Sequence, residues 1–102
     1  MSGYAVIAYD VNDPETYAKY NPGSLGVIME TIGKHGGEVM VATGESKWLH
    51  DERGVTVIIK FPSVDAAQAW LDDPAYAEAK KLRLASTENI VCFIAPEFVM
   101  PS

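Results

Sequence analysis

The sequence is poor in the residues that hold metals and disulfides, and this shortage excludes several classes of site. Among its 102 residues there are one cysteine and two histidines. A disulfide within one chain cannot form, and Cys92 lies inside an apolar run where we expect a buried thiol. Because the cysteine and histidines lack the spacing of metal ligands, we expect no bound metal.

Basic residues are also scarce. Eight Lys and Arg stand against 14 Asp and Glu, which gives a net charge of −6. This charge repels phosphate backbones and anionic lipids, and no local basic patch offsets it. No basic segment precedes the first apolar run, and no apolar run approaches the roughly 20 residues needed to cross a bilayer. We therefore expect a cytoplasmic protein that binds neither nucleic acid nor membranes.

Cofactor motifs and long low-complexity segments are missing as well. Gly36-Gly37 follows a predicted helix and lacks the spacing of a phosphate loop or a dinucleotide fingerprint, so we expect no cofactor. Hydrophobic residues at 48% and charged residues at 22% are ordinary globular values. The length predicts a single domain over residues 1–102, with residues 97–102 as a C-terminal tail.

What the sequence does contain is a repeated alternation of strands and helices. Asp13-Pro14 and Asp73-Pro74 each place a capping side chain before a proline at the first helical position, and Ser63 caps another helix. Proline and glycine at residues 21–24 break the first helical region in two. Apolar and β-branched residues predict strands over residues 4–11, 38–43, 55–61 and 89–95, with a long polar connection over residues 44–54.

This order predicts an α+β fold of the ferredoxin-like βαββαβ type, a four-stranded antiparallel sheet with helices on one face. The first, third and fourth strands carry apolar residues on both sides, whereas strands of a sheet with one solvent-exposed face should alternate apolar and polar residues. Burying roughly 600 Å² of apolar sheet would contribute on the order of 15 kcal/mol before association costs. We therefore expect a homodimer whose sheets pack face to face.

An ordered set of short motifs spans nearly the whole chain: Asp13-Pro14-Glu15, Tyr17, Tyr20, Gly36-Gly37, Phe61-Pro62-Ser63, Ala66, Ala67, Ala69-Trp70, Pro74-Ala75-Tyr76 and Leu82-Arg83. In this set the chain resembles the bacterial domain-of-unknown-function family 1330, part of the dimeric α+β barrel superfamily. The resemblance implies a ferredoxin-like subunit and a dimeric barrel, but no single activity. Members of the superfamily include cofactor-independent monooxygenases and small isomerases or lyases, which use the cavity between sheet and helices. The chain departs from the family's usual pattern at residues 45–50.

Arg83 is the first candidate for a functional residue. It shares a helix face with Tyr76, and a guanidinium beside a phenol could hold a carboxylate or enolate. The alternative is a structural ion pair with an acid such as Asp10, Asp72 or Asp73. Tyr20 is a candidate donor or general acid, and its alternative role is an amphipathic side chain at the edge of the core.

The remaining candidates lie on the first strand and the long connection. His50 could act as a base, or be a solvated loop residue. Asp10 could be a carboxylate with a raised pKa, or pair with Arg83 or with Lys60 at the end of its strand. Trp48 could line a pocket, stack on a flat ligand or fill the dimer interface.

Two functions follow from these residues. The first is a dimer that binds a small anionic or carbonyl metabolite, without turnover, in a cavity between sheet and helices, or whose cavity is filled by side chains. The alternative is a metal-free, cofactor-independent enzyme of the isomerase, lyase or monooxygenase type, with Arg83 and either Tyr20 or His50 as catalytic residues. In both, Tyr76, Asp10 and Trp48 contact the ligand. The ordinary structural roles open to each polar residue favour binding.

Overall fold

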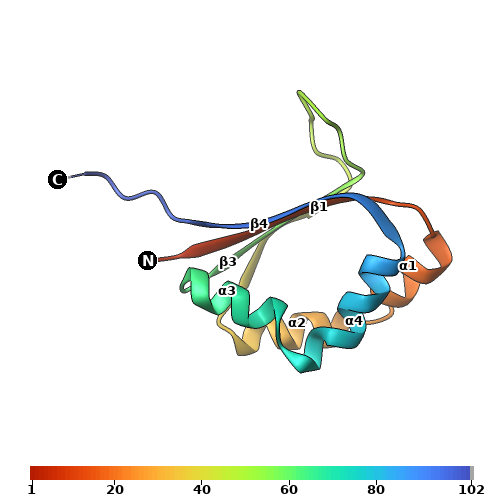
Figure 1. Cartoon of the computed structure of the whole chain (residues 1–102), viewed down its shortest axis with the longest axis horizontal. Coiled ribbons are helices and arrows are strands. Elements are labelled where there is room, and N and C mark those ends of the chain that lie inside the picture. Colours follow the sequence, from red (N-terminus) through yellow and green to blue (C-terminus); the bar gives the residue numbers. More distant parts are fainter. Residues whose placement is uncertain (102) are drawn as a thin grey trace.

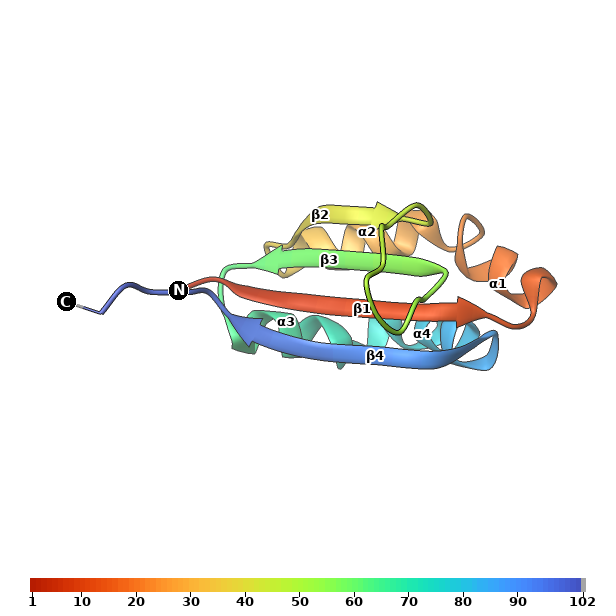
Figure 2. The same ribbon diagram turned by 90° about the horizontal axis from the view of Figure 1, so that it is seen from above.

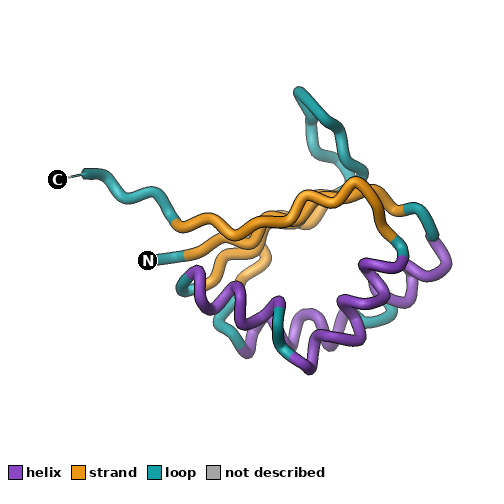
Figure 3. Tube along the Cα trace, in the orientation of Figure 1, coloured by secondary structure: helices purple, strands orange, loops and turns teal. Residues whose placement is uncertain are grey.

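The computed structural model of the chain describes residues 1–101, in which the sheet and the helices form two layers (Figure 1). Ser102, the last residue of the expected tail, lies outside the described residues. Strands and helices follow one another in the predicted order, with each helical region divided in two (Figure 3). The elements are β1 (Gly3–Val11), α1 (Pro14–Tyr20), α2 (Leu25–Lys34), β2 (Glu38–Thr43), β3 (Val55–Phe61), α3 (Val64–Leu71), α4 (Pro74–Ala85) and β4 (Thr87–Pro96).

The strands form one antiparallel sheet in the order β2-β3-β1-β4 (Figure 2). All the helices lie under one face of this sheet, and the 44–54 loop rises from the other face (Figure 1). The order confirms the ferredoxin-like βαββαβ fold predicted from the sequence. The sheet consequently has an inner face, covered by helices, and an outer face.

The helices begin where capping residues satisfy their first backbone N–H groups. The side chain of Asp13 accepts from the N–H of Thr16 at 3.2 Å, and that of Ser63 accepts from the N–H of Ala66 at 3.0 Å. Asp73 caps α4 by accepting from the N–H of Ala75 at 2.9 Å. Each cap lies at the position predicted from the sequence, because capping depends only on neighbouring residues.

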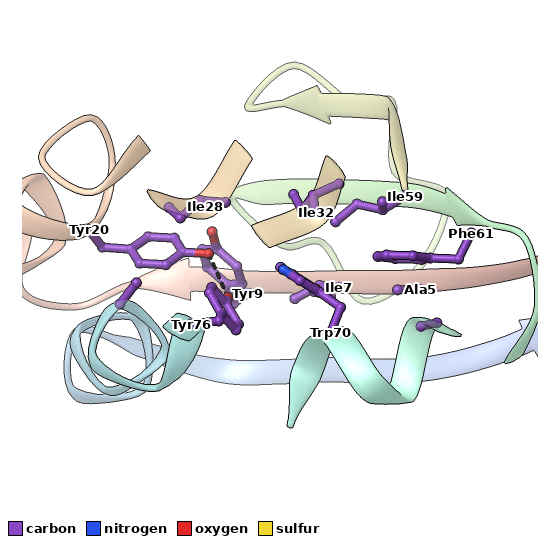
Figure 4. Close-up of a cluster of buried hydrophobic side chains, with 12 residues drawn as sticks. Ala5, Ile7, Tyr9, Tyr20, Ile28, Ile32, Ile59, Phe61, Trp70 and Tyr76 are labelled. Carbon is purple, nitrogen blue, oxygen red and sulfur yellow. Dashed lines mark hydrogen bonds between the residues drawn. The ribbon is translucent and has the colours of Figure 1, made fainter. Parts of the chain in front are cut away.

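A row of stacked aromatic side chains fills the layer between the sheet and α3. The ring centroid of Trp70 lies 5.7 Å from that of Phe61 and 4.4 Å from that of Tyr76 (Figure 4). The indole N–H of Trp70 donates to the hydroxyl of Thr31 on α2 at 3.1 Å, so its polar atom is satisfied although the residue is buried. This row closes one end of the space between the layers.

Asp73 also joins the end of α2 to the start of α4. Its Oδ2 accepts from Nε2 of His35 at 2.7 Å and from Nζ of Lys34 at 3.0 Å, and the residue is only 6% exposed. The hydrogen bond from His35, followed by those from the Ala75 N–H and Lys34, holds the pKa of this carboxyl well below its usual range. His35 thus contacts a carboxylate beyond its own helix.

The outer face of the sheet is mostly apolar, as the strand pattern predicts. The register places Val6 between Ile58 and Phe93, and Phe93 is 50% exposed. Cys92, which we expected to be buried, is exposed because β4 is an edge strand of the sheet. The outer-face residues on the three neighbouring strands are Tyr4, Val6, Ala8, Thr56, Ile58, Lys60, Val91, Phe93 and Ala95.

We predict that Asp73→Asn destabilises the protein at neutral pH and lowers its unfolding temperature by a few degrees, because the amide keeps the cap but loses the charge facing Lys34 and His35. A carboxyl with a lowered pKa stabilises the fold above its unfolded-state pKa of about 4, and this contribution disappears as the pH falls through the lower folded-state value. The difference from wild type, measured by urea unfolding, should therefore shrink from about pH 6 to about pH 2. Asp72→Asn is the control, since its exposed carboxylate accepts only from Gln68. A difference independent of pH would contradict this role for Asp73.

Candidate functional site

A cavity of about 320 Å³ lies between the inner face of the sheet and helices α1 and α2. Strands β1, β2 and β3 form one wall, and most of the remaining lining comes from α1, α2, Trp70 of α3 and Arg83 of α4. The exposed lining residues mark its mouth, between the start of α2 and the end of β2: Asn21, Leu25, Met29, Ala42 and Gly44. The cavity is therefore open to solvent and is not filled by side chains.

The wall of the cavity is apolar apart from a few side chains. Ile7, Ile28, Val57 and Ile59 belong to its interior surface. Its polar members are Arg83, the three tyrosines Tyr9, Tyr17 and Tyr20, and Asn21 and Thr43 near the mouth. In the described part of the chain, no Asp, Glu, His, Lys or Cys lines it. An apolar pocket with a few converging polar groups is the usual form of a small-molecule site.

Arg83 is the only charged group at the cavity within the described residues. It is 3% exposed, and its Cζ lies 6.0 Å from the centroid of the Tyr9 ring. Helix α4 buries Arg83 together with Tyr76 and Ala79, which are spaced at i, i+3 and i+7 on one side of the helix. Burial lowers the pKa of Arg83, whereas the nearby oxygens of Tyr76 and Tyr20 raise it. The net effect is a raised pKa. The guanidinium is therefore charged at every physiological pH.

The charge of Arg83 has no carboxylate partner in the described residues. The structural ion pair considered for it is wrong, because no acidic side chain within residues 1–101 forms a salt bridge with Arg83. Asp10, Asp72 and Asp73 all accept hydrogen bonds from other groups. In addition, Nε and Nη1 of Arg83 are buried without a hydrogen-bond partner within residues 1–101. Burying a cation without a counter-charge or full hydrogen bonding costs free energy, so stabilisation of the fold does not account for the presence of Arg83 at this position.

Two pairs of tyrosine hydroxyls lie next to Arg83. Tyr20 of α1 and Tyr76 of α4 meet at 2.9 Å, the bond drawn in Figure 4, and Tyr9 of β1 meets Tyr17 of α1 at 2.8 Å. Burial is the main cause that raises the pKa of Tyr9 and Tyr20 far above the usual value. Both phenols are consequently neutral hydrogen-bonding groups near pH 7.

The structure brings together three of the residues predicted from the sequence. Tyr20 and Arg83 line the cavity, and Tyr76 lies directly behind Tyr20. Sequence reasoning missed Tyr9, which supplies the ring beneath Arg83. The signal available in the sequence was that Tyr9 lies on the same side of its strand as Ala5 and Ile7, so a hydroxyl occurs on a mainly apolar face.

The other predicted site residues lie elsewhere. Asp10 accepts from the N–H of Gly54 at 2.7 Å and from Nδ2 of Asn89 at 2.9 Å, rather than from Arg83 or Lys60. The Asn89 bond, followed by the Gly54 bond, lowers its pKa, which is the opposite of the rise considered for a base. His50 and Trp48 belong to the 44–54 loop, which rises above the outer face (Figure 1), and they line a shallow hollow formed by residues 48–52. The structure does not bring these three to the cavity.

Two further features concern metals and membranes. Within residues 1–101, no three His, Cys, Asp or Glu side chains gather closely enough to hold a metal ion. In the same range, no helix combines the length and apolar character needed to cross a bilayer.

We predict that Arg83→Met leaves the free energy of unfolding of the ligand-free protein unchanged or raises it, by up to about 4 kcal/mol. Methionine keeps helix propensity and length while removing a buried charge that has no partner. Chemical denaturation followed by circular dichroism gives this value. Lys81→Met on the exposed side of α4 is the matched control and should change little. A loss of more than about 1 kcal/mol in Arg83→Met would show that Arg83 stabilises the fold.

This fold and cavity define a ferredoxin-like α+β protein with a buried arginine in an apolar pocket. The chain belongs to the family of the domain of unknown function DUF1330, whose sequence pattern matches residues 2–96. This confirms the family expected from the sequence. No curated protein matches the chain.

Solved structures share the fold at low sequence identity. A protein of unknown function from Rhodopseudomonas palustris, RPA0582, is 19% identical, with a TM-score of 0.74 over 97% of this chain and 84% of its own. A dimeric ferredoxin-like protein of unknown function from Jannaschia is 10% identical, with a TM-score of 0.73 over 95% of this chain and 100% of its own. A candidate antibiotic biosynthesis monooxygenase from Caulobacter crescentus is 15% identical, with a TM-score of 0.65 over 96% of this chain and 91% of its own. At these identities the likeness concerns the fold.

Proposed function

We propose that the protein is a homodimer that binds a small metabolite in the cavity between its sheet and its helices. The single observation that carries this proposal is the buried guanidinium of Arg83, which lines an open apolar cavity and has no carboxylate partner in the described residues. A ligand group that faces Arg83 would offset the cost of burying its charge. The apolar walls would hold the body of the same ligand by excluding water from it.

Binding without turnover is favoured over catalysis by the groups that line the cavity. General acid–base catalysis needs a side chain that exchanges protons near the working pH. The described lining residues include no acidic side chain and no histidine, and burial keeps Tyr20 protonated. His50, the alternative base, lies on the other side of the sheet.

A cofactor-independent enzyme remains the second candidate. It is favoured by the open cavity, in which Tyr17, Tyr20 and Arg83 all face one space. Some proteins of the same fold, such as the one from Caulobacter crescentus, are candidate monooxygenases. In such an enzyme Arg83 would hold a substrate oxygen and Tyr20 would donate a hydrogen bond to it.

We predict that Val57→Phe abolishes metabolite binding, because residue 57 forms part of the cavity wall and the larger ring occupies the space of the ligand. The purified protein is incubated with a small-molecule cell extract, washed, and its retained compounds are identified by mass spectrometry. Val64→Phe, the same substitution on the exposed start of α3, is the control and should retain what wild type retains. Circular dichroism confirms that both variants are folded.

Three outcomes are informative in this experiment. Equal retention by Val57→Phe and wild type would place binding outside the cavity. If wild type retains no compound at all, the binding proposal is wrong. A retained compound that is converted during incubation with wild type, but not with Arg83→Met, would favour the enzymatic candidate.

The dimer is proposed from the outer face of the sheet. Val6, Ile58, Val91 and Phe93 form an apolar surface that no helix covers. An exposed apolar surface of this kind typically marks an interface. The Jannaschia protein of the same fold is dimeric, as is one from Bacteroides fragilis. The loop that carries Trp48 rises from this face, so it would meet the second copy in a face-to-face dimer.

We predict that Phe93→Glu raises the dimer dissociation constant by about 10-fold or more, because a carboxylate would be buried in an apolar interface. Light scattering over a dilution series should show wild type at twice the 11.1 kDa mass of one chain and the variant at lower mass. Leu84→Glu on α4 is the control, because Leu84 is 49% exposed and Phe93 is 50% exposed. A monomeric wild type at micromolar concentration would contradict the dimer.

A further inference from the structure

We infer that the ligand group held at Arg83 is the carboxylate of a monoanion with an apolar body. This inference rests on the proposed function, since it names the chemistry of the molecule bound in the same cavity. It follows from the hydrogen-bond donors and acceptors around Arg83 and from the charge of the cavity wall.

The tyrosine pairs leave two hydroxyl protons unused. Each phenol has one O–H donor, and a bond between two hydroxyls consumes only one of the two protons. Tyr76 is fully buried behind Tyr20, and Tyr9 is more deeply buried than Tyr17. When each inner tyrosine donates to its partner, the protons of Tyr17 and Tyr20 are free. Both partners line the cavity, and their ring centroids are 5.8 Å apart.

Arg83 adds only donors to these two protons. A guanidinium has five N–H donors and no acceptor, and within residues 1–101 no hydrogen bond joins its Nε or Nη1 to another group. The three side chains therefore present a surplus of donors at one end of the cavity. The complementary ligand group is one that only accepts, and an ionised carboxylate has two oxygens with about four acceptor positions.

The charge of the wall limits the ligand to one negative charge at this point. Arg83 is the only cation that lines the cavity in the described residues, and no other Lys or Arg reaches it. A phosphate monoester carries close to two charges at neutral pH, so part of its charge would be buried without a partner. A neutral amide would bring N–H donors to a place that already has too many.

The rest of the cavity selects an apolar body of modest size. Beyond Arg83 and the tyrosines, the interior wall is formed by aliphatic side chains and Trp70, and its volume of about 320 Å³ is at the lower end for small-molecule sites. A ligand that fits is an aromatic or aliphatic monocarboxylate. Its body would contact the aliphatic lining residues, such as Ile7, Val57 and Ile59.

The test uses matched pairs of carboxylates and primary amides: benzoate and benzamide, phenylacetate and phenylacetamide, hexanoate and hexanamide, octanoate and octanamide. Titration calorimetry near pH 7 should show at least one carboxylate binding about 10- to 100-fold more tightly than its amide. Phenyl phosphate should bind more weakly than that carboxylate. Arg83→Gln should remove the preference for the carboxylate over its amide, and Tyr20→Phe should weaken binding of the carboxylate about 10-fold. Lys81→Gln, which removes an exposed cation from the same helix, should leave the preference for the carboxylate unchanged.

The outcomes separate this inference from the proposed function. If amides bind as tightly as carboxylates, the carboxylate inference is overturned and cavity binding stands. If phenyl phosphate binds more tightly than every carboxylate, the inference that the ligand carries a single negative charge is overturned. A preference that survives in Arg83→Gln overturns the role of Arg83. If no compound of the set binds, the inference is overturned, while the proposed function is decided by the retention of extract compounds in wild type and Val57→Phe.

Discussion

A positive charge buried without a counter-charge is the constraint around which this structure is organised. Arg83 lies inside the molecule, on the side of α4 that faces the sheet, and within residues 1–101 no carboxylate pairs with it. The ring of Tyr9 and the neighbouring phenol oxygens offset part of the cost. A bound anion of the kind proposed above would offset the remainder.

The rest of the fold holds α4 so that this charge stays in place. Asp73 begins the helix and ties it to the end of α2, the helix that forms the opposite wall of the cavity. The stacked row of Phe61, Trp70 and Tyr76 closes the space on the α3 side. The layers are therefore packed at one end and open at the other, and the cavity follows from this uneven filling.

The two faces of the sheet have different roles for the same physical reason. Both are apolar, and water must be excluded from both. On the inner face the helices cover most of the surface and leave a cavity, whereas on the outer face a second copy would cover it. The solved structures named above share 10–19% identity with the chain, so the fold persists while most of the sequence differs. The ligand proposed for this chain would accordingly be selected by its own cavity wall, with Arg83 and the tyrosines.

The sequence by itself determined the features that depend on neighbouring residues. The caps at Asp13, Ser63 and Asp73, the strand patterns and the shared helix face of Tyr76 and Arg83 all follow from local spacing, and with them the ferredoxin-like order of elements. Only the tertiary structure decided which polar groups meet across long separations. Asp10 pairs with Gly54 and Asn89, Cys92 is exposed on an edge strand, His50 lies above the outer face, and Tyr9 lies under Arg83. These outcomes depend on strand order and on the side to which a loop turns, which are set by packing between distant segments and leave no periodic trace in the sequence.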